Sequence, residues 1–257
     1  MDIFPARAGS IPVLRFESIG STNAEALKLA VAGQHEPLFV VAERQSAGRG
    51  RRGRAWISEP GNLHATLLLS DPAPPPVSAQ LCFVAALALH DAVLDDCPGL
   101  APSRLKLKWP NDLLLDEQKV AGILIEGTST PGGTAAVAIG FGVNCKHHPT
   151  ETQFPATDFA RAGFDLSPQS LLARLGERIE GRLDEWKGGD AFSATRAAWL
   201  LRASGVGNEV EVRLPDRTLG GIFETIDERG ELILRGNDGE RQTISAGDIF
   251  PLNAKAN

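Results

Sequence analysis

The chain has 257 residues, 42% of them hydrophobic, which fits one sizeable core with a small appendage and excludes a disordered protein. Its formal net charge is -6 at pH 7. That charge repels a phosphate backbone, so wholesale nucleic-acid binding is disfavoured and any attraction for phosphate has to come from local clusters.

The cysteines and the apolar segments bear on location. Cys82, Cys97 and Cys145 are an odd number, lie far apart and match no metal-ligand spacing, which favours a reducing cytoplasm. The N-terminal segment lacks the basic and apolar regions of a signal peptide, and no apolar run reaches the roughly 18 residues that span a membrane. We expect a soluble, cytoplasmic protein with no membrane partner.

The first elements are a strand and a helix. Residues 11–16 predict a short strand, after which Thr22 and Glu25 have the spacing of a capping box that begins a helix. Gly33 is expected to end this helix. The apolar residues expected along one of its faces are Leu27, Ala30 and Val31.

An arginine-rich loop joins the next two strands, which we expect at residues 38–42 and 63–69. The loop contains GRGRRGRAW at residues 48–56, with four arginines and three glycines before the alanine. So much positive charge on a flexible backbone, in a net acidic chain, needs an explanation in the function of this loop.

The middle of the chain predicts a core helix, four strands and two further helices. A proline-rich connector at residues 71–76 leads into a largely apolar helix at 77–94, which must be buried on most sides. The later strands are expected at 105–109, 112–115, 120–126 and 134–143, and the amphipathic helices at 170–186 and 191–203.

From Gly205 onward the pattern changes to short alternating strands, with a hairpin turn at residues 237–239. This change predicts two domains, residues 1–204 and a small separate β-barrel at residues 205–257. The barrel strands are expected at 209–214, 218–226, 231–235 and 241–245.

The glycine spacing of the arginine-rich loop formally matches the dinucleotide-binding fingerprint G-x-G-x-x-G, at Gly48, Gly50 and Gly53. The context does not fit, because a Rossmann turn opens a helix and the residues after this loop do not. A Rossmann site is therefore disfavoured. The chain also lacks the P-loop pattern.

Three interpretations of the loop remain. It is a solvated basic loop, an RG segment that touches RNA, or part of a phosphate site. Its position between two strands and the second polar cluster at KWPND, residues 108–112, with Lys119 shortly after, favour a small phosphorylated ligand.

With these motifs the chain resembles the bacterial biotin protein ligases of the type without an N-terminal DNA-binding domain. The matching segments recur in the family's order over most of residues 11–145. They are Ser21-Thr22-Asn23, Glu43-Arg44-Gln45 leading into GRGRRGRAW, Gly61-Asn62-Leu63, KWPND, the run from Lys119 to Leu124, and Gly140-Phe141-Gly142-Val143-Asn144.

The resemblance implies an α+β fold. Its catalytic domain would be a mixed β-sheet flanked by helices, as in class II aminoacyl-tRNA synthetases and biotin ligases, followed by a small C-terminal SH3-like β-barrel. It implies that biotin and ATP, with Mg²⁺, give biotinyl-5′-adenylate and pyrophosphate. The biotinyl group would then pass to one lysine of the carrier domain of acetyl-CoA carboxylase or a related carboxylase.

This chemistry explains the arginines. A carboxylate has to approach the α-phosphate of a polyanion, and arginine and lysine offset the repulsion between them. No general base is needed, because the carboxylate is already ionised at neutral pH.

The resemblance assigns the cationic residues. Arg51 and Lys119 would be catalytic, with Lys119 between the biotin carboxylate and the α-phosphate; a solvated hairpin lysine is the alternative. No metal site of protein side chains is expected, and Mg²⁺ would come with ATP near Asn111. The implied ATP-binding residues are Arg49, Arg51, Arg54, Lys108, Asn111, Asp112, Lys119 and Asn144.

Two of the implied biotin-binding residues and one ATP-binding residue have competing explanations. Thr22 also suits a helix cap, Trp56 also suits an ordinary core tryptophan, and Asp112 on the ATP side also suits a turn. The full implied biotin set is Ser21, Thr22, Asn23, Gln45, Arg49, Gly50, Arg51, Trp56, Lys119, Gly122 and Gly142.

Two rival functions stay open at this point. A lipoate or octanoate ligase would share the fold, but GRGRRGR together with KWPND indicates the biotin branch. A nucleic-acid binder is disfavoured by the acidic net charge and by the short segment before the first strand. The resemblance also implies pairing of two copies through the sheet edge, and we expect no DNA partner.

Overall fold

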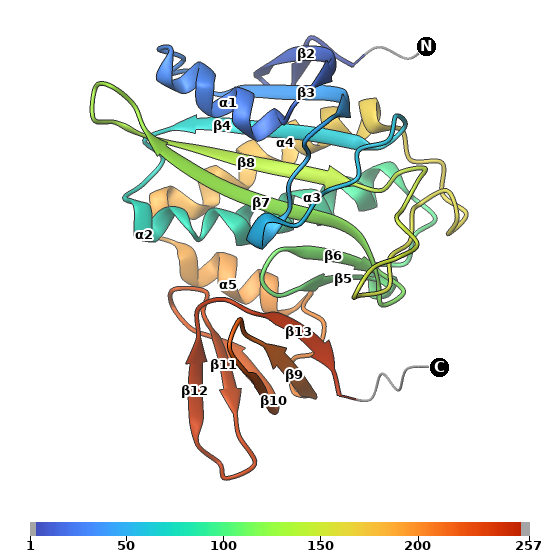
Figure 1. The fold of residues 1–257 in the computed structure, drawn as a ribbon, viewed down its shortest axis with the longest axis vertical. Helices are drawn as coiled ribbons and strands as arrows, with labels where there is room; N and C mark the ends of the chain where they lie inside the picture. Colours follow the sequence, from blue (N-terminus) through green and yellow to red (C-terminus); the bar gives the residue numbers. More distant parts are fainter. Residues whose placement is uncertain (1–3, 253–257) are drawn as a thin grey trace.

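Two β-sheets organise residues 4–252, the part of the chain described by this computed structural model (Figure 1). The larger sheet is mixed, because one neighbouring pair of strands runs parallel and the others run antiparallel. Its eight strands lie in the order β1 (Arg7–Ala8), β2 (Ile11–Ile19), β3 (Leu38–Gln45), β4 (Leu63–Ser70), β8 (Ala135–Val143), β7 (Gln118–Ser129), β6 (Asp112–Leu115) and β5 (Leu105–Lys108).

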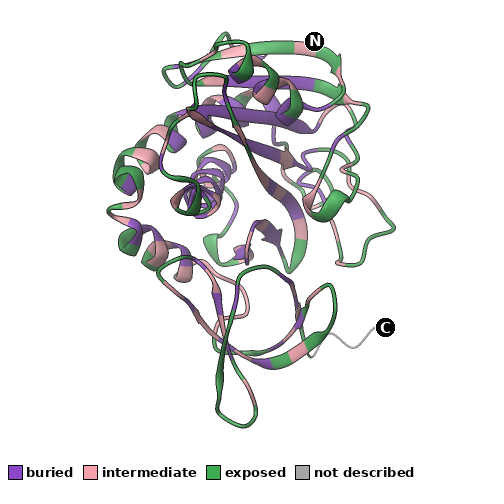
Figure 2. Ribbon diagram, turned by 60° about the vertical axis from the view of Figure 1, so that its left-hand side comes forward, coloured by how far each residue is buried: buried purple, intermediate pink, exposed green. Residues whose placement is uncertain are grey.

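Helices cover both faces of this sheet. Helix α1 (Thr22–Val31) packs on β3, β4 and β8 from one side, whereas α3 (Leu81–Asp96) and α4 (Pro168–Trp186) lie on the other (Figure 1). The central strand β4 is buried from residue 63 to 69, as its nearly continuous apolar sequence requires in a doubly covered sheet. Figure 2 shows the same central strands as buried. The predicted α+β class with a mixed sheet is confirmed.

Helix α1 differs from the prediction in its cap and its buried face. Ser21 is the N-cap and its hydroxyl accepts from the backbone N–H of Ala24, so Thr22 is the first helical residue and does not cap. Ala26 and Ala30 are fully buried, whereas Val31 is 46% exposed. The face turned to the sheet is therefore rotated from the expected one.

The apolar helical segment around α3 is longer than predicted, since no apolar run of the roughly 18 residues that span a membrane was expected. The stretch Pro75–Asp96, which joins α2 (Pro75–Ser78) to α3, has the length and apolar composition of a membrane-crossing helix. However, 72% of its most apolar 18-residue stretch is buried inside the protein. Contact with the sheet and with α4 explains its apolar sequence, as expected for a core helix.

The smaller sheet is antiparallel throughout and is consistent with the expected SH3-like fold. Four of its strands were predicted; the fifth, β13, was not, nor was β1 in the larger sheet. The ends of the two predicted domains, residues 1–3 and 253–257, lie outside the described part of the chain. The strand order is β12 (Arg241–Ile244), β11 (Leu232–Arg235), β10 (Thr218–Ile226), β9 (Glu209–Arg213) and β13 (Asp248–Pro251).

One turn docks the smaller sheet onto the rest of the protein. The indole N–H of buried Trp109 donates to the carbonyl of Gly230 over 2.9 Å. Gly230 has a φ of +82° and packs so closely on Phe83 that a side chain there would overlap the ring. Arg196 on α5 (Phe192–Leu200) also donates to Thr225 Oγ1 over 3.1 Å. In the docked arrangement Lys108 Nζ, at the end of β5, lies 5.7 Å from the ring centre of Phe250 on β13.

Helix α5 corresponds to the second predicted amphipathic helix. It is shorter than the predicted range 191–203, because it ends at Leu200. The 3₁₀ turns are η1 (Arg51–Gly53), η2 (Pro102–Arg104) and η3 (Lys187–Gly189).

Candidate active site

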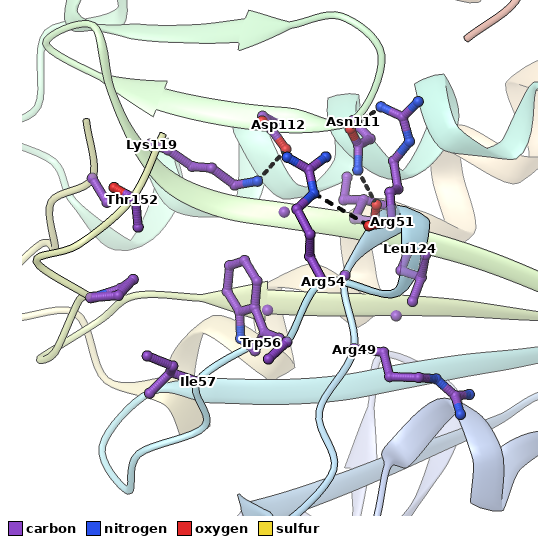
Figure 3. A pocket seen from close by; sticks show the side chains of 18 of the residues that line it. Arg49, Arg51, Arg54, Trp56, Ile57, Asn111, Asp112, Lys119, Leu124 and Thr152 are labelled. Atoms are coloured by element: carbon purple, nitrogen blue, oxygen red, sulfur yellow. Dashed lines mark hydrogen bonds and ion pairs between the residues drawn. The ribbon is translucent and has the colours of Figure 1, made fainter. Parts of the chain in front are cut away.

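A cavity of about 440 Å³ lies between the larger sheet and the arginine loop, which we define as residues 48–56 (Figure 3). Every site residue predicted from the sequence lines it. They are Ser21, Thr22, Asn23, Gln45, Arg49, Gly50, Arg51, Arg54, Trp56, Lys108, Asn111, Asp112, Lys119, Gly122, Gly142 and Asn144.

The arginine loop folds back on itself. The backbone N–H of Gly50 donates to Arg54 O over 2.7 Å, and that of Trp56 donates to Gly48 O over 2.9 Å. At the tip, Arg52 and Gly53 both have positive φ, +57° and +72°. Glycine adopts this conformation freely, but for arginine it is uncommon and therefore needs support from other contacts.

Every arginine of the loop has a side-chain partner. Arg49 Nη2 lies 3.1 Å from Glu126 Oε1 on β7. Arg51 Nη1 donates to Asn111 Oδ1 over 3.1 Å (Figure 3). Arg52 and Arg54 both pair with Asp248 on β13. The loop thus lies closed over the cavity, held from three directions.

Arg51 is the most confined of these arginines. Burial lowers the pKa of its guanidinium, and the nearby Cys82, Asp248 and Asp112 oppose that effect. The group nevertheless stays charged at neutral pH, because the pKa of arginine starts above 12. A confined cation with few water contacts interacts strongly with an anionic ligand.

A second cationic cluster faces the loop. Lys119 Nζ lies 2.6 Å from Asp112 Oδ1, and Lys108 Nζ lies 3.5 Å from Asp112 Oδ2. Burial alone would raise the pKa of Asp112, but the two ammonium groups outweigh it and hold that pKa below the ordinary value. Burial lowers the pKa of Lys108, and Asp112 opposes the shift. One carboxylate therefore holds two lysines in the cavity wall.

The backbone of Lys119 is anchored as well. Its N–H donates to Pro155 O over 2.8 Å, and its carbonyl accepts from Thr157 over 3.0 Å. This short pairing joins the start of β7 to the segment after β8. Lys119 is therefore not the solvated hairpin lysine that the sequence left open.

The opposite end of the cavity is uncharged and rich in hydrogen bonds. Gln45 Oε1 accepts from both the backbone N–H and the hydroxyl of Thr22, at 2.8 and 3.1 Å. Thr66 Oγ1 lies 2.8 Å from Thr22 Oγ1 and 2.6 Å from Asn23 Oδ1. Gln45 Nε2 donates to Ser58 over 2.9 Å. Thr66 and Ser58 were not predicted, because neither lies in a recognisable motif.

Asn23 joins this network to the loop. Its Nδ2 donates to Glu126 Oε2 over 2.9 Å, and the same carboxylate pairs with Arg49. Gly140 leaves the room that Asn23 needs, since a side chain there would overlap the amide. Glu126, like Thr66 and Ser58, is a residue of this network that the sequence did not reveal.

Trp56 lies against the sheet inside the cavity. Its ring covers Gly142 and Gly122, and a side chain at Gly142 would overlap the indole. Lys119 Nζ is 5.6 Å from the ring centre. The two glycines were expected to admit a ligand to the backbone; here the space above them holds the tryptophan. The buried Nε1 has no hydrogen-bond partner within residues 4–252.

The third wall comes from segments with no predicted role. Phe154, in the loop after β8, and Phe250, on β13, lie 6.0 Å apart between ring centres. Lys108 Nζ lies 4.4 Å from the first ring and 5.7 Å from the second. Arg213 stacks on the outer side of Phe250 at 3.9 Å. Only tertiary docking of the smaller sheet brings Phe250 to the cavity.

The two asparagines are oriented by the fold. Asn111 Nδ2 donates to Ile123 O over 2.6 Å, which leaves Oδ1 for Arg51. Asn144 is buried and its Nδ2 donates to Thr157 O over 3.1 Å. Both side chains line the cavity, and their roles toward a nucleotide stay predictions.

The cysteines do not supply a nucleophile. Cys145 is fully buried, and burial raises the pKa of its thiol to about 12. Burial likewise raises the pKa of Cys82 to about 12. Within the described residues, no group of three His, Cys, Asp or Glu side chains could hold a metal ion.

The arrangement suits a reaction between two anions. The cavity has a hydrogen-bonding end for a neutral polar ring, a cationic middle at Lys119 and Arg51, and an aromatic and cationic end at Lys108, Phe154 and Phe250. Preorganised cations in a confined site stabilise charge that develops during a reaction.

Known proteins share this sequence and this fold. A model of the Biotin/lipoate A/B protein ligase family matches residues 15–144, and one of the Biotin protein ligase C terminal domain matches residues 205–250. A biotin--[acetyl-CoA-carboxylase] ligase of Paracoccus denitrificans is 43% identical, covering 90% of this chain and 96% of its own length. The enzyme of that name from Mycobacterium tuberculosis is 35% identical over 91% of this chain and 86% of its own. Among solved structures, a biotin protein ligase from Aquifex aeolicus in complex with biotin and ATP superposes with a TM-score of 0.75 at 25% identity, covering 93% of this chain and 97% of that one.

Proposed function

The chain belongs to the biotin/lipoate A/B protein ligase family and is a biotin protein ligase, and we propose that this cavity carries out both steps of the activity. In the first, a carboxylate oxygen of biotin attacks the α-phosphorus of ATP. The bond between the α-phosphorus and the bridging oxygen breaks, and pyrophosphate leaves with the electron pair. The product is biotinyl-5′-adenylate.

Lys119 and Arg51 are the catalytic residues of this proposal. Their cationic groups line the middle of the cavity, where the biotin carboxylate and the α-phosphate have to meet. Cations there stabilise the negative charge that spreads over the phosphoryl oxygens. The loop that carries Arg51 lies closed over this point, so it also excludes water from the reactive adenylate.

The hydrogen-bonding end of the cavity accommodates the ureido ring of biotin. That ring needs acceptors for two N–H groups and a donor for its carbonyl. Ser21, Thr22, Asn23 and Gln45 present hydroxyl and amide groups that can fill both needs, and their mutual bonds hold them in place. Trp56 would pack along the apolar valeryl chain between the ring and Lys119.

ATP occupies the other end in the proposal. Lys108 and Arg54 supply cations for the phosphates, and Asn144 lies on the adenine side. Arg49, the third predicted cation, pairs with Glu126 beside Asn23 and would have to leave that carboxylate to join them. The oxygen ligands at this end, Asn111 Oδ1 and the Asp112 carboxylate, are paired with Arg51 and with the two lysines. They therefore fit only a magnesium ion that is held mostly by the phosphates, which is how Mg²⁺ usually binds. When bound, Mg²⁺ would neutralise part of the phosphate charge, and the lysines and arginines of the cavity would neutralise the remainder.

In the second step the neutral amine of a carrier lysine attacks the biotinyl carbonyl carbon. An amide bond forms, the bond from that carbon to the phosphate oxygen breaks, AMP leaves and the amine proton passes to solvent. The relatives named for acetyl-CoA carboxylase support a carrier domain of that enzyme as the acceptor.

Three further expectations belong to the proposal. A cytoplasmic location is supported by three unpaired cysteines. Pairing of two copies through β2 is supported by its edge, since within residues 4–252 the short strand β1 pairs only with Ile11 and Pro12, and the one further backbone bond on this side runs from Val13 to Ala6 O. No DNA or membrane partner is expected. Sedimentation of the full chain with and without biotin and ATP tests the pairing.

The observation that carries the function is the convergence of Lys119, Arg51 and Lys108 on one cavity together with the family match. The test is incubation with labelled ATP, biotin and a carrier domain, measuring both pyrophosphate release and transferred biotin. We expect one pyrophosphate per biotin attached. Pyrophosphate release with lipoate in place of biotin, and none with biotin, would overturn the assignment.

A further inference from the structure

Asp248 lies on β13 of the smaller sheet, far in sequence from the arginine loop, and yet lines the cavity. We propose that Asp248 is a positioning residue for the adenylation reaction: it clasps Arg52 and Arg54 and so keeps the loop closed, with Arg51 aimed at the substrates. The purpose of this clasp rests on the proposed function, but its existence does not.

The geometry divides one carboxylate between two arginines. Asp248 Oδ1 lies 3.0 Å from Arg54 Nη2, and Oδ2 lies 3.3 Å from Arg52 Nη1. The neighbouring carbonyl of Gly247 accepts from Arg51 Nη1 over 3.4 Å. Three of the four arginines therefore meet one dipeptide of the smaller sheet.

The loop needs such an anion. Its four arginines repel one another, and closing it also brings them toward Lys108 and Lys119. Three glycines give the open loop many conformations, so closure costs entropy. Within the described residues, the carboxylates that pair with the loop are Glu126, at Arg49, and Asp248, at the tip.

The tip itself is built around this contact. Arg52 has a φ of +57°, in a region that arginine seldom adopts, and its guanidinium reaches Asp248 from there. Arg52 does not line the cavity, whereas Arg51 does. The two adjacent arginines thus have different tasks, one holding the loop and the other facing the ligand.

The carboxylate is held on a rigid support. Asp248 pairs in strand register with Arg213 on β9. The smaller sheet is fixed to the rest of the protein by the hydrogen bond from Trp109 to Gly230. Trp109 lies two residues before Asn111, whose Oδ1 accepts from Arg51. The segment that carries Asn111 is therefore tied directly to the sheet that carries Asp248.

The test compares Asp248→Asn with Asp248→Glu and with a control, Glu224→Gln, which breaks an ion pair with Arg241 on the same sheet. All are made in the full chain. One readout is the rate of tryptic cleavage after Arg51, Arg52 and Arg54 in the ligand-free protein, followed by mass spectrometry. The other is the half-life of bound biotinyl-5′-adenylate after its synthesis from biotin and ATP.

We expect Asp248→Asn to speed cleavage in the loop and adenylate release by about tenfold or more, with an unchanged melting temperature. Asp248→Glu should recover most of both, and Glu224→Gln should match wild type. Wild-type cleavage rates in Asp248→Asn would overturn the clasp. If the wild-type chain makes no biotinyl-adenylate, the proposed function fails, while the cleavage rates still decide whether the clasp exists.

Discussion

Lys119 and Asp112, on neighbouring strands β7 and β6, form an ion pair with 2.6 Å between Nζ and Oδ1, and Lys108 shares the same carboxylate. Lys119, one of the two cations assigned to the transition state, thus already lies in the cavity wall before any ligand arrives. A substrate phosphate has to compete with Asp112 for these ammonium groups. Preorganisation of this kind reduces the reorganisation that the reaction itself requires.

Removing either catalytic cation should slow adenylate formation strongly. A well-aimed donor is worth on the order of 3 kcal/mol in the barrier, which is roughly 100-fold in rate. Lys119→Ala and Arg51→Ala should each show this loss in single-turnover pyrophosphate release. Lys28→Ala removes an exposed lysine of α1 and serves as the control. Near wild-type rates in either variant, with the fold intact, would refute the assigned role.

Asp112→Asn should change the pH dependence of adenylate formation. Burial already lowers the pKa of Lys108, and Asp112 opposes that shift, so its loss lets Lys108 give up its proton at a lower pH. Activity that needs a charged Lys108 is present below that pKa and is lost as pH rises through it. The alkaline limb of the rate profile should therefore move to lower pH. Superimposable profiles would show that Lys108 is not required as a cation.

Gly142→Ala should weaken biotin binding more than it weakens the fold. A Cβ at this position overlaps the indole of Trp56, which then has to leave its place in the cavity. The control is Gly127→Ala in β7, where an added Cβ meets nothing closer than 3.5 Å. Titration calorimetry with biotin should show about a tenfold loss for the first variant and little for the second. Equal affinities would remove Trp56 from the binding site.

Asp91 should make stability depend on pH in the acid range. Burial alone would raise its pKa, but His90, Arg182 and Arg202 outweigh it and lower the pKa to about 2. A depressed carboxyl pKa contributes stability above the ordinary value of 3.8 that is lost as pH falls toward 2. Asp91→Asn should cost roughly 1 to 2 kcal/mol at pH 7 and progressively less below pH 4, by urea unfolding.

The matched control for that experiment is Asp95→Asn. Asp95 pairs with Arg178 on the same two helices, but both side chains are more exposed. Exposed pairs contribute little, so a loss below about 0.5 kcal/mol is expected. A loss at Asp91 that does not shrink in acid would mean that packing, and not the ion pairs, explains it.

Local motifs made part of the site predictable. The arginine loop, KWPND and Lys119 are contiguous or near in sequence, and the strand pairing of β6 with β7 follows from a short turn between them. Residues 118–129 and 135–143 alternate or run apolar as strands should, so the sheet could be anticipated. The choice of Ser21 over Thr22 as the helix cap could not be predicted, because it depends on the backbone conformation of a single residue.

The rest of the site depends on tertiary docking. Asp248 and Phe250 lie in a short strand with no motif, and they reach the cavity only because Trp109 and Gly230 hold the smaller sheet beside β5. Phe154 lies in an irregular loop that is tied to β7 near Lys119. No local pattern distinguishes such residues from surface positions. The apolar sequence of α3 is likewise explained only by the layers that bury it.

A crystal structure of the chain with biotin and a non-hydrolysable ATP analogue would show directly whether Lys119 and Arg51 bring the two anions together. We expect the biotin carboxylate and the α-phosphate side by side, with Lys119 Nζ and the Arg51 guanidinium within hydrogen-bond distance of both, about 3 Å. Ligands bound elsewhere, or those two side chains directed away from the phosphate, would contradict it.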